Sequence, residues 1–114
     1  MQIRLILIYL GLRLVGGDRM KVKYSPIFND IDNLNYTFGD DILTIELNGV
    51  VDIFDFRGLP DGELEVENIE TALEYNMIKE AKRIDGELYL VLRNFIGENA
   101  SYEERFPDWI DVNG

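Results

Sequence analysis

The sequence predicts a mainly β protein: a small antiparallel sheet of five to six strands built from hairpins, with a short C-terminal helix. Three observations predict it. Short runs of alternating apolar and polar residues recur, Asn-Gly and Asp-Gly pairs sit inside two of them, and clusters of Pro, Gly, Asn and Asp end the others. A β-rich α+β fold is the alternative. With 114 residues, of which 46% are hydrophobic, the chain is long enough for one domain with a real core.

The composition is strongly acidic, with 11 Lys and Arg residues against 22 Asp and Glu residues and a net charge of -11. Such a field repels nucleic acids and anionic membrane surfaces, so we expect neither as a partner, whereas it favours solubility or a basic partner. The chain has no cysteine and no histidine, which removes disulfides, thiolate nucleophiles and Cys/His zinc sites. We therefore expect no metal, no cofactor and no enzymatic activity.

The first apolar run, Ile3 to Leu10, fits three interpretations poorly. Arg4 and Arg13 bracket too few residues for a membrane helix, which needs about 20. A secretory signal is weak, because Arg13 interrupts the apolar region and no small-x-small cleavage site follows. As a strand, the run is apolar on both faces and would need burial on both sides.

Residues 16–20, Gly-Gly-Asp-Arg-Met, indicate a different origin for this segment. Codons for Gly-Gly-Asp can contain the purine-rich ribosome-binding signal of bacterial messages, with Arg19 as a spacer before Met20 as a start codon. We expect residues 1–19 to be a non-native upstream extension, poorly ordered or attached to an exposed sheet edge. Residues 20–114 then form a single β-rich domain. A genuine first strand or anchor is the alternative.

The domain begins with two short strands separated by a loop. Residues 21–24, KVKY, alternate, and we expect this strand to end at Ser25-Pro26 because proline cannot donate to a ladder. Residues 28–35 are dense in Asn and Asp, which predicts a loop. Residues 34–38, LNYTF, form the next strand, which residues 39–41 close.

Asn48-Gly49 is the clearest local signal in the chain, because it lies between two alternating apolar runs. Both residue types tolerate the positive φ that a two-residue type I′ turn requires, so we predict a tight hairpin. The register pairs Leu47 with Val50, Ile45 with Asp52, and Leu43 with Phe54. We expect one face to form the core, namely Leu43, Ile45, Leu47, Val50, Phe54 and Phe56.

A second hairpin is predicted in residues 77–95, with Asp85-Gly86 as its turn. Its second strand divides into one face with Leu88, Leu90 and Leu92 and another with Tyr89, Val91, Arg93 and Phe95. Its first strand carries Lys79, Glu80, Lys82 and Arg83. We place that strand at a sheet edge, where charge discourages edge-to-edge pairing.

The segment between the hairpins is less regular. A turn is predicted at residues 59–62, Leu-Pro-Asp-Gly. Ile69, Ala72 and Leu73 would align on one face of a short helix, but an extended or irregular path fits the mixed pattern equally well.

The C-terminal region predicts a short capped helix. Ser101 and Glu104 have capping-box spacing, and Pro107 limits the helix to one or two turns. We expect Trp109 and Ile110 to pin the tail back on the sheet.

Carboxylates are the only abundant reactive groups. Asp52 is the carboxylate to consider first, because the hairpin register places it on the core face beside Ile45 and Phe54. Paired carboxylates can carry out glycoside hydrolysis, but a rim position, a bulge or a hydrogen bond to a neighbouring amide explains Asp52 more simply. We therefore name no catalytic, cofactor-binding or metal-binding residue.

Calcium binding is the other chemistry to consider, because residues 29–35 and 61–67 gather oxygen atoms. A loop starting at Asp30 fails the EF-hand spacing: Asn35 holds the glycine position and Asp41 the glutamate position. We expect surface loops at both places.

Four stretches resemble a set of small acidic proteins encoded among the tail and late genes of bacteriophages and prophages of Gram-positive bacteria. They are MKVKYSP, the Asn-Gly hairpin leading into DIFDFRGLPDG, DGELYLVLRNFIG, and YEERFPDWIDV, which together span Met20 to Val112. The shared residues are turn and core residues, so the resemblance carries over no functional residue. It implies a start at Met20 and a location in the bacterial host cytoplasm and the virion.

Three functions follow, in decreasing order of support. The first is a non-enzymatic phage structural or assembly accessory that binds another phage protein, a tail or fibre component, and can self-associate through sheet edges. The second is an acidic inhibitor of a host defence or nucleic-acid-binding enzyme. The third is a small carboxylate hydrolase or carbohydrate binder, supported only by acids near aromatic residues.

Overall fold

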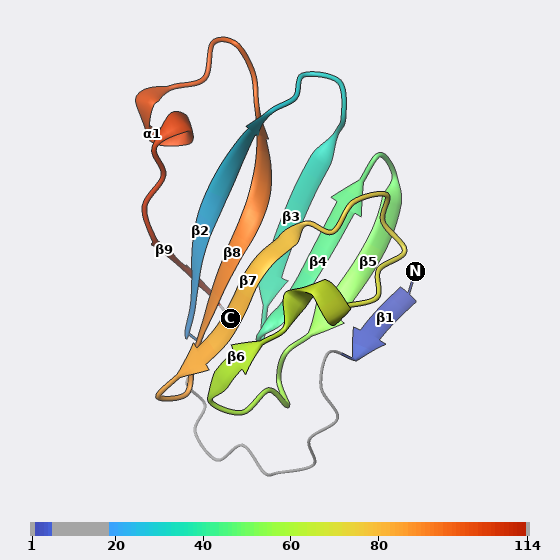
Figure 1. The fold of residues 1–114 in the computed structure, drawn as a ribbon, viewed down its shortest axis with the longest axis vertical. Helices are drawn as coiled ribbons and strands as arrows, with labels where there is room; N and C mark the ends of the chain where they lie inside the picture. Colours follow the sequence, from blue (N-terminus) through green and yellow to red (C-terminus); the bar gives the residue numbers. More distant parts are fainter. Residues whose placement is uncertain (1, 6–18, 114) are drawn as a thin grey trace.

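The computed structural model describes residues 2–5 and 19–113 as two β-sheets packed face to face, with one short α-helix (Figure 1). The mainly β fold class is thereby confirmed. The predicted organisation is too simple, however, because the described residues form nine strands in two sheets, and two of the strand pairings are parallel. Alternation along a strand shows that one face is buried, but not which sheet the strand joins.

The first sheet has the strand order β1-β5-β4-β3. Its strands are β1 (Gln2–Leu5), β3 (Leu34–Gly39), β4 (Ile42–Leu47) and β5 (Val50–Asp55). Strands β3, β4 and β5 form an antiparallel meander, and β1 pairs in parallel with β5.

The second sheet has the order β6-β7-β8-β2-β9. Its strands are β2 (Arg19–Phe28), β6 (Gly62–Leu64), β7 (Ile78–Ile84), β8 (Glu87–Ile96) and β9 (Ile110–Asn113). A 3-10 turn (Val66–Asn68) follows β6, and α1 (Tyr102–Arg105) lies between β8 and β9. The long parallel pair of β2 with β8 is the centre of this sheet.

The Asn48-Gly49 hairpin is confirmed in every pairing. Asn48 has φ 52° and Gly49 φ 82°, and the three predicted residue pairs are all present. The core face is also confirmed, with one exception: Val50 is 46% exposed because it lies next to the turn. Asp40 and Asp41 also have positive φ, so β3 and β4 are joined by a second tight turn that the sequence analysis treated only as a strand end.

The first strand of the domain is longer than predicted. We expected it to end at Ser25-Pro26, but β2 continues through both residues to Phe28, and Pro26 lies opposite Asn94 of β8. On its other side β2 pairs with β9 only over Arg19–Val22. Within the described residues, Pro26 therefore lies where one edge of β2 has no strand partner, and an edge tolerates the missing N–H.

The Asp85-Gly86 hairpin is confirmed, with φ 49° and 81° at its turn. Leu88, Leu90 and Leu92 are fully buried, as predicted. The edge position of β7 is only partly right, because the short β6 covers Ala81–Arg83 and leaves the start of β7 without a partner on that side. A bulge lies between Ile78 and Glu80.

One continuous core lies between the sheets. The first sheet supplies Leu43, Ile45, Leu47, Phe54 and Phe56, and the second supplies Met20, Val22, Ile78, Ala81, Leu88, Leu90 and Leu92. Tyr24, Tyr36 and Phe38 extend this core as a row of stacked rings, with centroids 5.9 Å and 6.2 Å apart. Together these residues bury the apolar face of both sheets, which is the main stabilising contribution.

The turn predicted at residues 59–62 lies earlier, because the Leu59 amide donates to the Phe56 carbonyl at 3.0 Å and β6 begins at Gly62. The rest of this segment and the C-terminal region follow the predictions more closely. Residues 69–77 contain no helix, and Leu73 of this segment is buried. The capping box is present: the Glu104 amide donates to the Ser101 hydroxyl at 3.1 Å, and the Ser101 amide donates to Glu104 Oε1 at 3.0 Å. Trp109 packs edge-on against Tyr89 at 5.5 Å, whereas Ile110 joins β9 with its side chain 44% exposed.

The interpretation of residues 1–19 falls largely outside the described residues, because residue 1 and residues 6–18 are not among them. The backbone of Gln2–Leu5 lies along the edge of the first sheet, against β5. Arg19 is the first residue of β2.

Candidate interaction surface

Asp52, the carboxylate that the sequence analysis noted, is fully buried on the core face of β5, where the hairpin register placed it. Its Oδ1 accepts from the Ile53 amide at 3.0 Å. Its Oδ2 accepts from the Ala72 amide at 2.8 Å and from the Thr71 hydroxyl at 2.9 Å. These bonds fasten the irregular segment after β6 to the first sheet. The geometry gives Asp52 a structural task, in line with the simpler interpretation of a bond to a neighbouring amide.

A second buried charge, Arg83, was not anticipated. Its side chain is 4% exposed and donates to the carbonyls of Leu59, Phe56 and Gly86 at 2.6 to 2.8 Å and to Asp41 Oδ2 at 3.1 Å. This one guanidinium holds the loop after β5, the β3–β4 turn and the β7–β8 turn together. Its charge in a strand of charged residues suggested an exposed edge, so only the fold shows its burial.

The four lysines of the chain are Lys21, Lys23, Lys79 and Lys82. All of them lie on the outer face of the second sheet, the face that points away from the core. On β2, Lys21 and Lys23 alternate with the buried Met20 and Val22. On β7 a bulge lies between Ile78 and Glu80. Because a bulge places two residues of one strand opposite a single residue of its partner, two neighbouring residues of β7 can point to this outer face.

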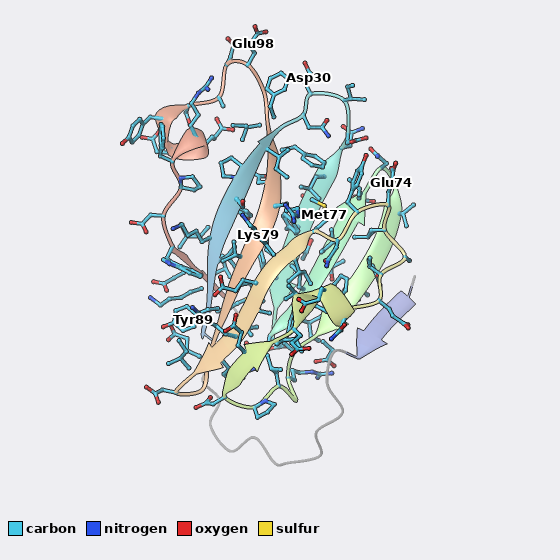
Figure 2. The ribbon with its side chains drawn as sticks, in the orientation of Figure 1. Asp30, Glu74, Met77, Lys79, Tyr89 and Glu98 are labelled. Carbon is cyan, nitrogen blue, oxygen red and sulfur yellow. The ribbon has the colours of Figure 1, made fainter. Side chains whose placement is uncertain are left out.

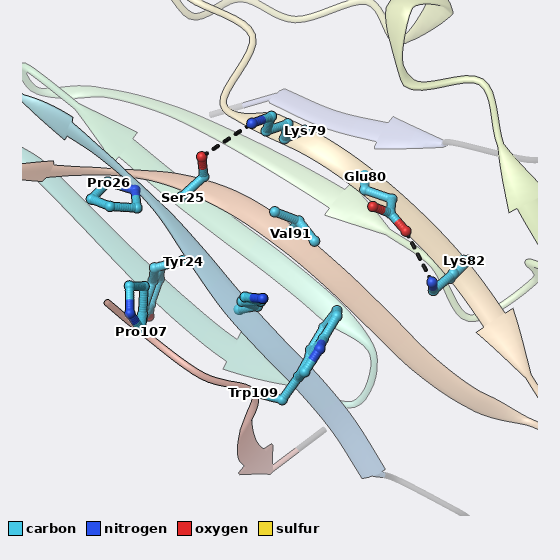
Figure 3. Close-up of a pocket in the computed structure, with 10 residues that line it drawn as sticks. Tyr24, Ser25, Pro26, Lys79, Glu80, Lys82, Val91, Pro107 and Trp109 are labelled. Carbon is cyan, nitrogen blue, oxygen red and sulfur yellow. Dashed lines mark hydrogen bonds and ion pairs between the residues drawn. The ribbon is translucent and has the colours of Figure 1, made fainter. Parts of the chain in front are cut away.

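Three of these lysines line a hollow of about 470 Å³ that Figure 3 shows. Its floor is formed by Lys23 and Ser25 of β2 and Val91 of β8, with Lys79, Glu80 and Lys82 of β7 on one side. Pro107 and Trp109 of the C-terminal segment form the opposite side. The only tryptophan of the chain therefore lies beside this cluster of cations.

The lysines differ in how far their charge is compensated. Lys21 Nζ lies 3.2 Å from Asp111, and Lys82 Nζ lies 3.0 Å from Glu80. These hydrogen-bonded carboxylates raise the pKa of both lysines above the ordinary value. Lys79 donates to the Ser25 hydroxyl at 3.3 Å, and Lys23 forms no ion pair with any described residue. Among the described residues, Lys23 and Lys79 are thus the lysines whose charge no carboxylate compensates.

A second hollow, of about 520 Å³, continues the first along the same sheet face. It is lined by Ile27, Asn29, Tyr75, Asn76, Met77, Arg93 and Phe95. Ser25 of the first hollow is paired with Arg93 of the second, and the next pair on this face is Ile27 with Phe95. We call the two hollows together the trough. Figure 2 shows Lys79 along its course, Met77 at the start of β7, and Tyr89 near the opposite end.

The trough has mainly cations in its middle, together with Glu80, and aromatic or apolar side chains near both ends. Lys23, Lys79 and Arg93 lie in the middle, and the Arg93 Nε donates to the Asn76 carbonyl at 3.1 Å. Near one end Trp109 packs against Tyr89, which lies between the ion-paired Lys21 and Lys82. At the other end Ile27 and Tyr75 are 36% and 44% exposed. Phe28 and Ile31 are exposed too, at 62% and 85%, but Phe28 points to the opposite face of β2 from Ile27.

Of the two segments considered for calcium, residues 61–67 do not form the predicted loop, because they contain β6 and the start of the 3-10 turn, whereas residues 29–33 form a loop between β2 and β3. Asn29 Oδ1 accepts from the amides of Ile31 and Asp32, and the Asn29 and Asn48 side-chain amides donate to Asp32. These amide donors hold the pKa of Asp32 below its ordinary value. No cluster of metal-ligating side chains occurs within the described part of the chain.

An acidic strip begins at β6, the edge strand of the second sheet, and continues along the chain to the second hollow. Residues 61–78 contain no Lys or Arg, and the exposed acids of this segment are Asp61, Glu63, Glu65, Glu67, Glu70 and Glu74. The strip thus carries negative charge only, and its end reaches the trough, which Tyr75 lines next to Glu74.

The signal for the trough is visible in the sequence in hindsight. All lysines fall in two predicted strands, at positions 21, 23, 79 and 82. What the sequence lacked was the parallel pairing of β2 with β8, which places those strands in one sheet.

Comparison with known proteins adds no assignment, because no family model, curated protein or solved structure matches the chain. Within the described residues, no helix has the length and apolar character needed to cross a membrane.

Proposed function

We propose that this protein is a non-enzymatic phage or prophage accessory, associated with the tail or tail fibres, that works through protein–protein contacts. The observation that carries the proposal is the trough. A chain with a net charge of -11 gathers all its lysines and its only tryptophan on one sheet face. Folding alone does not require that arrangement, because surface lysines contribute little to stability and solubility needs no segregation of charge.

The roles of the buried polar groups are a second argument for a binding function. Asp52 and Arg83, the most deeply buried charged groups besides Asp41, each accept or donate several hydrogen bonds that tie loops to sheets. Both are committed to holding the fold. The groups that remain available to another molecule lie on the surface, and the trough combines charge with exposed aromatic area, as interfaces do.

The test is affinity capture with the tagged full chain in lysate from phage-producing cells, at low and at raised salt. We expect a tail or fibre component, and because the trough has aromatic or apolar side chains near both ends, part of that binding should survive raised salt. Failure to capture any phage protein from a lysate that contains assembled and unassembled tails would overturn the proposal.

The acidic strip favours a second candidate function, inhibition of a host defence or nucleic-acid-binding enzyme. Glu65, Glu67 and Glu74 are exposed in a segment whose sequence contains no Lys or Arg, and such a surface could bind a basic partner. The same capture experiment separates the two candidates. A basic host enzyme that is lost as salt rises would support the inhibitor, because its contacts would be mostly charge pairs.

Self-association through sheet edges remains part of the proposal. Within the described residues, β2 has no partner on one side beyond Val22, and β7 has none on one side before Ala81. Pro26 and Lys79 stand on those open stretches, and both residue types discourage strand addition. We expect any self-association at these edges to be weak.

A further inference from the structure

We propose that the trough binds an extended segment of a partner protein, in which a central group of carboxylates is flanked by apolar or aromatic side chains. This inference rests on the proposed function, since it names the chemistry of the partner at the same surface. It follows from the shape, the charge and the order of side chains along the trough.

The shape of the trough fits an extended chain. Its floor follows consecutive same-face pairs of β2 and β8, from Lys23 with Val91 to Ile27 with Phe95. Four residue steps along a strand cover about 13 Å, the length of an extended segment of about four residues. The C-terminal segment, with Trp109, closes one side of the first hollow, so a ligand would run along the sheet face (Figure 3).

The order of side chains sets the pattern of the ligand. Lys23 and Lys79 form no ion pair with any described residue, and Arg93 uses its Nε on the Asn76 carbonyl. These cations call for carboxylates in the middle of the ligand. Trp109 at one end, and Tyr75 and Phe95 at the other, offer aromatic surface to apolar side chains.

The net charge of the chain decides between a protein segment and a nucleic acid. A nucleic acid carries a negative charge at every nucleotide, and the long-range field of a -11 chain repels all of them. The same field repels a peptide segment less, because two or three carboxylates carry less charge than a nucleic acid, and the local cations of the trough can offset that repulsion. Lysines also suit carboxylates that approach from several directions, because an ammonium group has no fixed fork geometry.

Trp109 makes the inference measurable, because it is the single tryptophan of the chain and lies in the trough. We would titrate the full chain with a synthetic peptide in which glutamates are flanked by phenylalanines, and follow the tryptophan fluorescence. Two further probes are the same peptide with lysines in place of glutamates and an oligothymidylate of similar length. We expect a saturable change with the glutamate peptide only, weakened about fivefold or more by raised salt.

Charge-reversal variants locate the contact. Lys23→Glu and Lys79→Glu should each weaken binding of the glutamate peptide by about fivefold or more, since each removes one attraction and adds a repulsion. Arg57→Glu is the matched control. It changes the net charge equally, but Arg57 is exposed in the turn after β5 and pairs with Asp55, away from the trough. We expect it to bind the peptide within about twofold of the original chain.

Several outcomes would overturn the inference. They are equal weakening by all three variants, binding of the lysine peptide or of oligothymidylate in place of the glutamate peptide, and no fluorescence change with any probe. A chain that dimerises in sedimentation and loses the dimer in Lys23→Glu would make a second copy the occupant instead. Capture of a tail component by chains with and without Lys79→Glu alike would refute the trough as the site and leave the proposed function standing.

Discussion

Arg83 offers the sharpest test of how this sandwich is held together, and the change to make is Arg83→Met. Methionine keeps the length of the aliphatic stem and removes the guanidinium. The carbonyls of Leu59, Phe56 and Gly86 then lose their donor, and Asp41 keeps its buried carboxylate without the arginine.

The size of the effect follows from burial. Arg83 and Asp41 side chains are 4% and 1% exposed, so solvent screens their interaction little. Removing one partner of a buried ion pair costs about 3–5 kcal/mol. A domain of this size has a total stability of about 5–15 kcal/mol, so the loss would be a large share of it. At about 4 °C per kcal/mol, the melting temperature should fall by about 12–20 °C.

Urea unfolding, followed by Trp109 fluorescence and far-ultraviolet circular dichroism, measures this loss as a lower midpoint at an unchanged slope. The matched control is Arg105→Met, because Arg105 also donates to two backbone carbonyls, of Ala100 and Glu98, but does so on the surface. We expect it to cost at most about 0.5 kcal/mol. Adding Asp41→Asn to Arg83→Met should recover part of the loss.

A loss below about 1 kcal/mol for Arg83→Met, or one equal to that of Arg105→Met, would refute this reasoning. It would mean that the three loops hold their positions without the guanidinium. The same result would also remove one of the structural arguments that support a binding protein.

Three further predictions concern turns and ionisation. Replacing Asn48-Gly49 by Val-Val should cost about 2–4 kcal/mol in urea unfolding, because both positions have positive φ, and an unchanged midpoint would contradict the hairpin. Because the pKa of Asp32 is lowered in the folded chain, its carboxylate stabilises the fold at pH values above the ordinary pKa of 3.8, and this contribution is lost as the pH falls through the lowered pKa. Asp32→Asn should therefore make the urea midpoint depend less on pH in the acid range. Burial raises the pKa of Tyr36 above its ordinary 10.0, so stability is full below pH 10.0 and falls as the pH rises further; an alkaline unfolding curve unchanged in Tyr36→Phe would refute this.

The sequence by itself determined the features that depend on neighbouring residues. The hairpins at Asn48-Gly49 and Asp85-Gly86 follow from residues that tolerate positive φ, and the strand register follows from the two-residue turns. The capping box of α1 is equally local, since Ser101 and Glu104 are three residues apart. Even the burial of Asp52 followed from that register, although its partners in residues 71–72 did not.

Only the tertiary structure decided the features that join distant segments. The parallel pairing of β2 with β8 carries β2 through Pro26 and brings the lysines of β2 and β7 onto one face. The burial of Arg83 depends on three loops that meet at its guanidinium. The physical reason is the same in each case: turn sterics and alternation act over a few residues, whereas the choice of sheet, neighbour and exposed face depends on how the apolar faces of distant strands bury one another.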